Sequence, residues 1–123
     1  MKLEVLSQSF SVCKITTLED ANFTGEFCFV AKTNEEISYV CETEDVPVNA
    51  LQVDDSWRAF RVQGVLDFSL IGILSEISGI LAQHKISVFA ISTYNTDYVL
   101  TKAESFEKAI TALQESGYET TEL

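Results

Sequence analysis

Residues 57–81, WRAFRVQGVLDFSLIGILSEISGIL, change their hydrophobic pattern at Gly64. Before this glycine, apolar residues are mixed with two arginines, a pattern typical of a strand. After it, apolar residues recur at spacings of three and four, which predicts a continuous apolar stripe on a helix. Asp67 and Ser69 are candidate N-caps for that helix. The stripe consists of Leu70, Ile73, Leu74, Ile77, Ile80 and Leu81.

Residues 86–100, ISVFAISTYNTDYVL, predict two strands. The first, residues 86–93, is β-branched and apolar on both faces, as expected of a buried inner strand. The second, residues 98–101, follows a polar turn of four residues, 94–97. Two strands joined by so short a turn predict a β-hairpin.

A second amphipathic helix follows, with Ser105 as its expected N-cap and Gly117 at the position just after its end. Residues 118–123 leave room for only a short final strand, so the N-terminal half or a second chain is expected to complete the sheet. The order βαββα with a short or absent last strand predicts an α+β fold, in which an antiparallel sheet carries both helices on one face. The apolar positions of this helix are Phe106, Ala109, Ile110 and Leu113.

The N-terminal half is predicted to be rich in strands. Two short apolar runs, residues 26–31 and 37–41, are joined by a polar loop of hairpin length. Residues 42–55 hold the single proline and five acidic residues, which predicts a connector with at most one helical turn around residues 48–51. This half carries no helical stripe like the one in residues 70–81.

The composition excludes several classes of protein. The chain has 123 residues, 46% of them hydrophobic, which is enough for a compact core. Its net charge is −11, from 8 basic and 19 acidic residues, so we expect no binding to nucleic acid or to an anionic membrane. No apolar stretch is long enough to span a membrane, and the start, MKLE, lacks the layout of a signal peptide. The sequence therefore predicts a soluble, cytoplasmic protein.

No catalytic, metal or cofactor site is predicted. His84 is the single histidine and falls where a helix end is expected, so it is interpreted as a surface residue. Cys13, Cys28 and Cys41 show no metal-ligand or disulfide spacing and are interpreted as inert buried thiols. Phosphate-binding glycine motifs are absent, and the scattered carboxylates are interpreted as solvated loops rather than metal ligands. We expect a protein that is not an enzyme.

Two segments are candidates for ligand binding. The turn into the first helix offers free backbone N–H groups and the positive end of the helix dipole, which suit a carboxylate. Gly72 there favours either close approach of a ligand or tight packing of helix on sheet, and both interpretations stay open. The polar run of residues 92–98 is longer than its turn requires, and Asp97 would either hold an ammonium group or bind turn amides. Together the two segments would suit a free amino acid.

Residues 64–74, 81–82, 86–94 and 96–100 resemble the ACT domain superfamily, and more closely the small bacterial tandem-ACT proteins. These are similar to the regulatory ACT domains of aspartate kinases and to the arginine-sensing CASTOR proteins. The resemblance implies a ferredoxin-like βαββαβ ACT domain in residues 55–123, preceded by a reduced, ACT-like half in residues 1–54. It implies a ligand site at an interface between ACT units. The residues of that site would be Leu66, Asp67, Phe68, Ser69, Leu70, Ile71, Gly72, Ser92, Thr93, Tyr94, Asn95, Thr96 and Asp97.

These expectations combine into a functional hypothesis. The chain is expected to be a stand-alone regulatory sensor that binds a small ligand, an amino acid, at an interface between ACT units and shifts an assembly equilibrium. A homodimer or another homo-oligomer is the expected assembly. The alternative is a module for protein interaction or oligomerisation that has no ligand. An Asp97 variant that loses ligand binding but still folds would distinguish the two.

Overall fold

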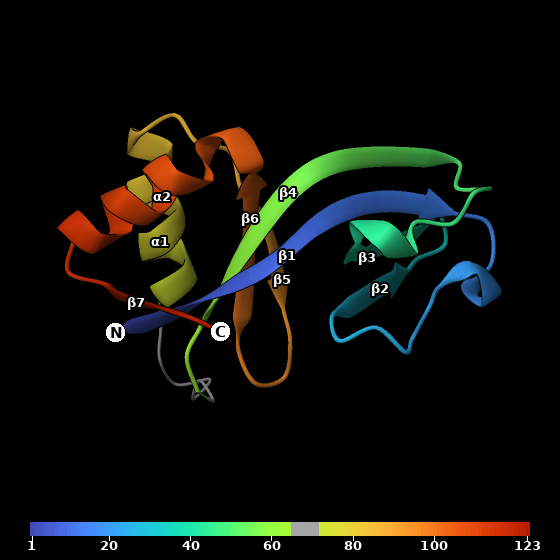
Figure 1. The fold of residues 1–123 in the computed structure, drawn as a ribbon, viewed down its shortest axis with the longest axis horizontal. Coiled ribbons are helices and arrows are strands. Elements are labelled where there is room, and N and C mark those ends of the chain that lie inside the picture. The colour runs from blue at the N-terminus through green and yellow to red at the C-terminus, as the bar shows by residue number, and fades with distance from the viewer. Residues whose placement is uncertain (65–71) are drawn as a thin grey trace. The chain divides into compact units, whose positions relative to one another are not determined.

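The structure is a computed structural model in which residues 1–64 and 72–123 are described (Figure 1). Unit 1 consists of Met1–Ser7 and Arg58–Leu123, and unit 2 consists of Gln8–Trp57. The sequence-based division between residues 54 and 55 lies three residues before the start of the second segment of unit 1. The first seven residues pack with the C-terminal half, because their strand belongs to the sheet of unit 1.

Unit 1 has an α+β architecture, as predicted. Its strands are in the order β1, β4, β6, β5, and β7 pairs with β1 in parallel. Both helices cover one face of this sheet (Figure 1). Strands β1 and β4 also contribute residues to unit 2. The elements are β1 Lys2–Ile15, β4 Gln52–Val62, α1 Ile73–Gln83, β5 Phe89–Ser92, β6 Asp97–Lys102, α2 Ala103–Glu115 and β7 Glu119–Glu122.

The start of the chain completes this sheet. Strand β1 occupies the position beside β4 that a long final strand would take, and the short β7 adds to its outer edge. The main-chain N–H of Gln63 donates to the carbonyl of Lys2, at 2.9 Å. Leu3 and Val5 are buried in the same core as Phe60 and Leu113. The N-terminal half thus supplies the missing strand, as the short C-terminal segment led us to expect.

The two predicted apolar stripes do form the core of unit 1. Ile77 and Leu81 from α1 and Phe106, Ala109 and Leu113 from α2 are buried together. Burying such stripes against a sheet is the main source of helix stability in a domain of this size.

Three predicted boundaries, and the burial predicted for one strand, differ from the structure. Strand β4 begins at Gln52, five residues earlier than expected, because its first five residues are exposed and all but Val53 are polar, which makes a weak strand signal. Helix α2 begins at Ala103 with Lys102 as N-cap, so Ser105 is not the cap. Gly117 does follow the helix end, in a left-handed conformation with φ of 100°. The predicted inner strand of residues 86–93 is shorter and lies at the edge of the unit 1 sheet, where β5 alternates half-buried and exposed residues.

Unit 2 contains the predicted hairpin. Its strands, β2 (Cys28–Lys32) and β3 (Ile37–Glu42), are antiparallel, and β3 pairs with β1. Two short 3₁₀ turns, Leu18–Asp20 and Thr43–Asp45, complete the unit. The connector after β3 begins with the second of these 3₁₀ turns. It holds one more hydrogen-bonded turn near the predicted place, at residues 48–49, where the N–H of Ala50 donates to the carbonyl of Pro47 at 3.2 Å.

The three cysteines meet in the core of unit 2. Cys28 and Cys41 are directly opposite each other on β2 and β3, and Cys13 is opposite Tyr39, two residues before Cys41. Because side chains alternate along a strand, the three thiols share one face. Burial raises the pKa of the Cys41 thiol to about 12, with the neighbouring Cys13 adding to the effect. Cys13 and Cys41 are buried, as predicted, whereas Cys28 is half-buried. A thiol that stays protonated is a poor nucleophile.

Candidate functional site

The predicted ligand-binding residues fall into two groups in the structure. Leu66, Asp67, Phe68, Ser69, Leu70 and Ile71 lie outside the described residues. Gly72 and residues 92–97 are described, and they form the start of α1 and the turn between β5 and β6.

Gly72 is the N-cap of α1 and not part of its first turn. It adopts φ of 86°, a left-handed conformation that side chains rarely take. Among the described residues, nothing lies within 4 Å of where its Cβ would be. Backbone conformation, rather than close packing, therefore accounts for this glycine within the described chain. Asp67 and Ser69, the predicted N-caps, lie outside the described residues.

Two threonines close the β5–β6 turn. The main-chain N–H of Thr93 donates to the carbonyl of Thr96 at 2.8 Å, and the Thr93 hydroxyl donates to the same carbonyl at 2.9 Å. The N–H of Thr96 donates back to the Thr93 hydroxyl at 3.3 Å. Tyr94, 80% exposed, and Asn95 project from this closed turn into solvent.

Asp97 stands at the base of the turn, opposite Ser92. The Ser92 hydroxyl donates to Asp97 Oδ1 at 2.6 Å. The N–H groups of Thr93 and Thr96 bond within the turn, whereas the hydrogen bond that Asp97 accepts at Oδ1 comes from the Ser92 hydroxyl and not from a turn amide. Within the described chain, Asp97 Oδ2 accepts no hydrogen bond. A half-exposed carboxylate held by one hydroxyl is suited to receive an ammonium group.

Thr96 fixes the turn to the neighbouring strand. Its buried hydroxyl donates to the carbonyl of Val62, the last residue of β4, at 2.8 Å. The chain leaves β4 at this point toward Gly64 and the segment that was predicted to bind a carboxylate. Figure 1 shows the β5–β6 turn, the end of β4 and the start of α1 at the same end of unit 1. The hydrogen bond from Thr96 thus links the turn to β4, the strand that precedes the second candidate segment in the chain.

Replacing Thr96 with valine is expected to lower the free energy of unfolding by about 1–3 kcal/mol, because the buried carbonyl of Val62 loses its side-chain donor while the shape of the side chain is kept. Urea denaturation of both proteins measures the difference. Thr16→Val, at an exposed position, is the control and should stay within about 0.5 kcal/mol of the parent. Equal losses in both variants would contradict the anchoring role of Thr96.

A polar cluster beside this turn was not predicted from the sequence. Arg61 donates to Glu4 at 2.9 Å and to the Tyr98 hydroxyl at 3.0 Å. Burial lowers the pKa of Arg61, but the bonds to Tyr98 and Glu4 outweigh it and leave the pKa raised. Arg61 and Glu4 are 57 residues apart in sequence, so no local pattern connects them. Its hydrogen bonds link β4, the strand that precedes the candidate site, to β1 and β6.

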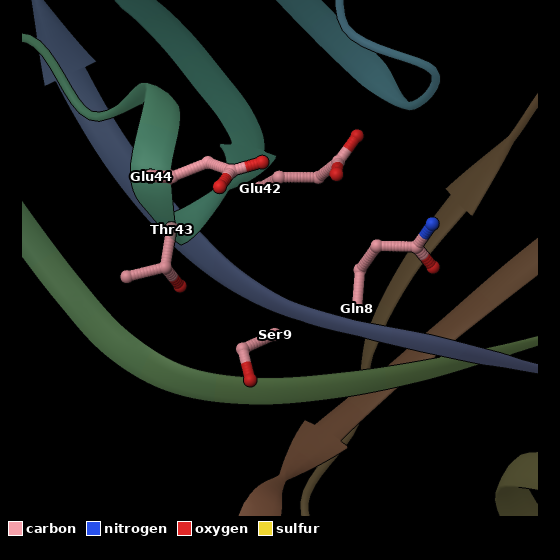
Figure 2. Close-up of a pocket in the computed structure, with 5 residues that line it drawn as sticks. All are labelled: Gln8, Ser9, Glu42, Thr43 and Glu44. Carbon is pink, nitrogen blue, oxygen red and sulfur yellow. The ribbon is translucent and has the colours of Figure 1, made fainter.

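Unit 2 has an acidic pocket of about 290 Å³ (Figure 2). Gln8, Ser9, Glu42, Thr43 and Glu44 line it. Glu42 also accepts a hydrogen bond from the main-chain N–H of Phe27, at 3.3 Å. The described chain contains no group of His, Cys, Asp and Glu residues that could hold a metal ion. His84 ends α1, where its Nδ1 lies 3.0 Å from the carbonyl of Ile80, which agrees with a structural role.

The sheet, the two helices on one face and the anchored turn define an α+β domain of ferredoxin-like topology. The ACT domain family model matches residues 52–115, and the chain belongs to this family. That match covers β4, both helices and the β5–β6 turn. No helix in the described residues is long and apolar enough to cross a membrane.

Solved structures show the same fold. A protein of Agrobacterium tumefaciens is 26% identical, with a TM-score of 0.88 over 99% of this chain and 92% of that one. A protein of unknown function from Vibrio cholerae is 19% identical, with a TM-score of 0.73 over 90% of this chain and 85% of that one. Aspartate kinase from Clostridium acetobutylicum, an allosteric enzyme, is 13% identical, with a TM-score of 0.61 over 88% of this chain but 32% of its own. No curated protein matches the chain.

Proposed function

We propose that this ACT protein is a regulatory sensor that binds a free amino acid at the β5–β6 turn and the segment leading into α1, at an interface between ACT units. The observation that carries the proposal is the carboxylate of Asp97, held by Ser92 at the base of a turn that Thr96 fixes to β4. The ligand's ammonium group would bind Asp97. Its carboxylate would bind main-chain N–H groups near the start of α1.

A likeness between the two hairpins supports the prediction that the N-terminal half is itself ACT-like. Strands β3 and β6 are 60 positions apart and have the same sequence of buried and half-buried residues. Thr33 N–H donates to the carbonyl of Glu36 at 2.9 Å, as Thr93 does to Thr96. A 3₁₀ turn follows β3 where α2 follows β6. We infer that unit 2 is a reduced ACT unit that has lost its helices.

A thermal unfolding screen against the free amino acids tests the sensor. A ligand present at 100 times its dissociation constant adds about 2.7 kcal/mol to the free energy of unfolding. We expect one amino acid to raise the midpoint by several degrees, and Asp97→Asn to abolish the rise while it leaves the unliganded midpoint near that of the parent. Glu115→Gln, on the exposed end of α2, is the control and should keep the full response. A parent protein that no amino acid stabilises would overturn the proposal.

A pairing module is the second candidate, favoured by the edge position of β5. The outer side of an edge strand can pair with a strand of another chain, and β5 ends the strand order of the described sheet. If β5 pairs two copies, Ala90→Lys should convert a dimer into a monomer, because a lysine at this exposed position disfavours strand addition. Light scattering after size exclusion measures the mass. A dimer that persists in this variant would exclude pairing through β5.

A further inference from the structure

A second pocket in unit 1 lies away from the proposed sensor site. It has a volume of about 250 Å³ and is formed by α2, β7 and the strands beside them. No residue of the β5–β6 turn or of the start of α1 lines it. The polar and charged groups of its wall include Arg58, Glu107, Thr111, Gln114, Thr121 and Glu122.

Arg58 is held in a fixed orientation at this pocket. Its guanidinium lies over the ring of Phe106, 4.6 Å from the ring centre, and its Nη2 donates to the carbonyl of Leu6 at 3.0 Å. Stacking on an aromatic face and one bond to a buried carbonyl leave little freedom for the side chain. A guanidinium fixed before a ligand arrives costs less to order on binding.

Among the described residues, Arg58 has no ion-pair partner, and one of its N–H groups has no acceptor. Its Nε is buried and meets no hydrogen-bond partner among the described residues. Arg61, on the same strand, forms a salt bridge with Glu4, whereas no described carboxylate lies within salt-bridge distance of Arg58. A buried N–H of a charged group without an acceptor is costly and rare in native proteins. Because Arg58 lines the pocket and forms no ion pair with a described carboxylate, its guanidinium can receive an anionic group there. A carboxylate satisfies a guanidinium best, because its two oxygens match two N–H groups.

Two carboxylates on the same wall remain separate from Arg58. Glu107 on α2 and Glu122 on β7 are exposed, and neither is paired with the arginine. The pocket therefore presents one positive and two negative groups with space between them. Opposite charges that line one pocket without pairing are complementary to a small zwitterion. A dianion would be repelled by the two glutamates.

From these groups we propose that this pocket is a second small-molecule site, which binds a zwitterionic α-amino acid through Arg58 and the two glutamates. The ligand's carboxylate binds Arg58, and its ammonium group binds Glu107 and Glu122. Thr111, Gln114 and Thr121 supply hydroxyl and amide groups for a polar side chain. The volume limits the ligand to a small amino acid, since it is below the range of drug-sized pockets.

NMR of the ¹⁵N-labelled full chain tests this site, because the Nε–Hε group of Arg58 gives its own signal. The probes are the free L-amino acids, with acetate as a carboxylate without an ammonium group and glycinamide as an amine without a carboxylate. At millimolar concentrations, at least one small amino acid is expected to shift the Arg58 Nε–Hε signal and the side-chain amide of Gln114. Acetate and glycinamide should bind about tenfold more weakly or worse, because each makes only half of the charged contacts.

Two variants locate the binding. Glu107→Gln and Arg58→Lys should each weaken it about tenfold, while Glu104→Gln, one turn away on the exposed face of α2 and outside the pocket, should leave it unchanged. Arg58→Lys keeps the charge but cannot bind two carboxylate oxygens side by side. Because Glu107 is exposed, Glu107→Gln is expected to fold like the parent. The site is excluded if no amino acid shifts the Arg58 signal, if acetate binds as tightly as the best amino acid, or if both variants bind normally. Shifts confined to residues 92–97 and abolished by Asp97→Asn would support the sensor site and exclude this one.

Discussion

Replacing Phe60 with alanine is expected to lower the free energy of unfolding by about 3–5 kcal/mol, the usual cost of removing a large buried aromatic ring. Phe60 is fully buried at the centre of the unit 1 core, with its ring 6.4 Å from that of Phe106. The variant loses both the transfer free energy of the ring and the contacts of the atoms that surround the new cavity. Urea denaturation followed by circular dichroism measures this loss.

A second phenylalanine provides the control. Phe23 is 65% exposed, so Phe23→Ala should change the free energy of unfolding by no more than about 0.5 kcal/mol. If the two variants lost similar amounts, Phe60 would not be part of a packed core. The proposed packing of β4 under both helices would then be wrong.

The second large effect is a loss of stability in alkaline solution. Burial raises the pKa of the Cys41 thiol to about 12 from an ordinary value of 9.0. Below pH 9 the thiol is protonated in both states, so its contribution to stability is fully present. Between pH 9 and 12 the unfolded chain loses this proton and the folded chain keeps it. The free energy of unfolding should therefore fall by up to about 1.4 kcal/mol per pH unit for this group alone.

Two tyrosines add to the loss at higher pH. Burial raises the pKa of Tyr39 and of Tyr118 to about 12, and in Tyr118 the hydrogen bond to Glu76 adds to the rise. Their contributions decline from pH 10 upward, with the same sign as that of Cys41. Denaturation midpoints from pH 7 to pH 11 measure the decline. Cys41→Ala should have a smaller slope between pH 9 and 10, while Tyr118→Phe should differ only above pH 10; a parent whose stability is constant up to pH 11 would contradict these assignments.

Regulation by the proposed sensor requires two states with different affinity for the ligand. The β5–β6 turn is well placed for such a response, because Thr96 couples it to β4 and β4 contributes residues to both units. A ligand that binds Asp97 would add a contact at this turn. A ligand in the second pocket, at α2 and β7, would contact a different part of unit 1. Binding at the two sites can be distinguished with Asp97→Asn and Glu107→Gln.

The sequence by itself determined the local elements of this protein. The stripe on α1, the hairpin of β5 and β6, the stripe on α2 and Gly117 after its end all follow from spacing within short windows, and the family follows from the motif around them. Periodicity works here because a helix or strand must turn its apolar residues to one side. The local signal failed where residues were polar yet ordered, as at the start of β4, or apolar yet at an edge, as in β5.

Only the tertiary structure decided which distant residues meet. It brought β1 beside β4 to complete the sheet, paired Arg61 with Glu4, joined Thr96 to Val62, and placed Arg58 between Phe106 and Leu6. The spacing of apolar residues records which side of an element is buried, but not which element covers it. That choice depends on the packing of the whole core, where each contact joins residues that are far apart in the chain. The anchor of the β5–β6 turn and the position of Arg58 depend on such contacts, whereas Ser92 and Asp97 meet within one hairpin.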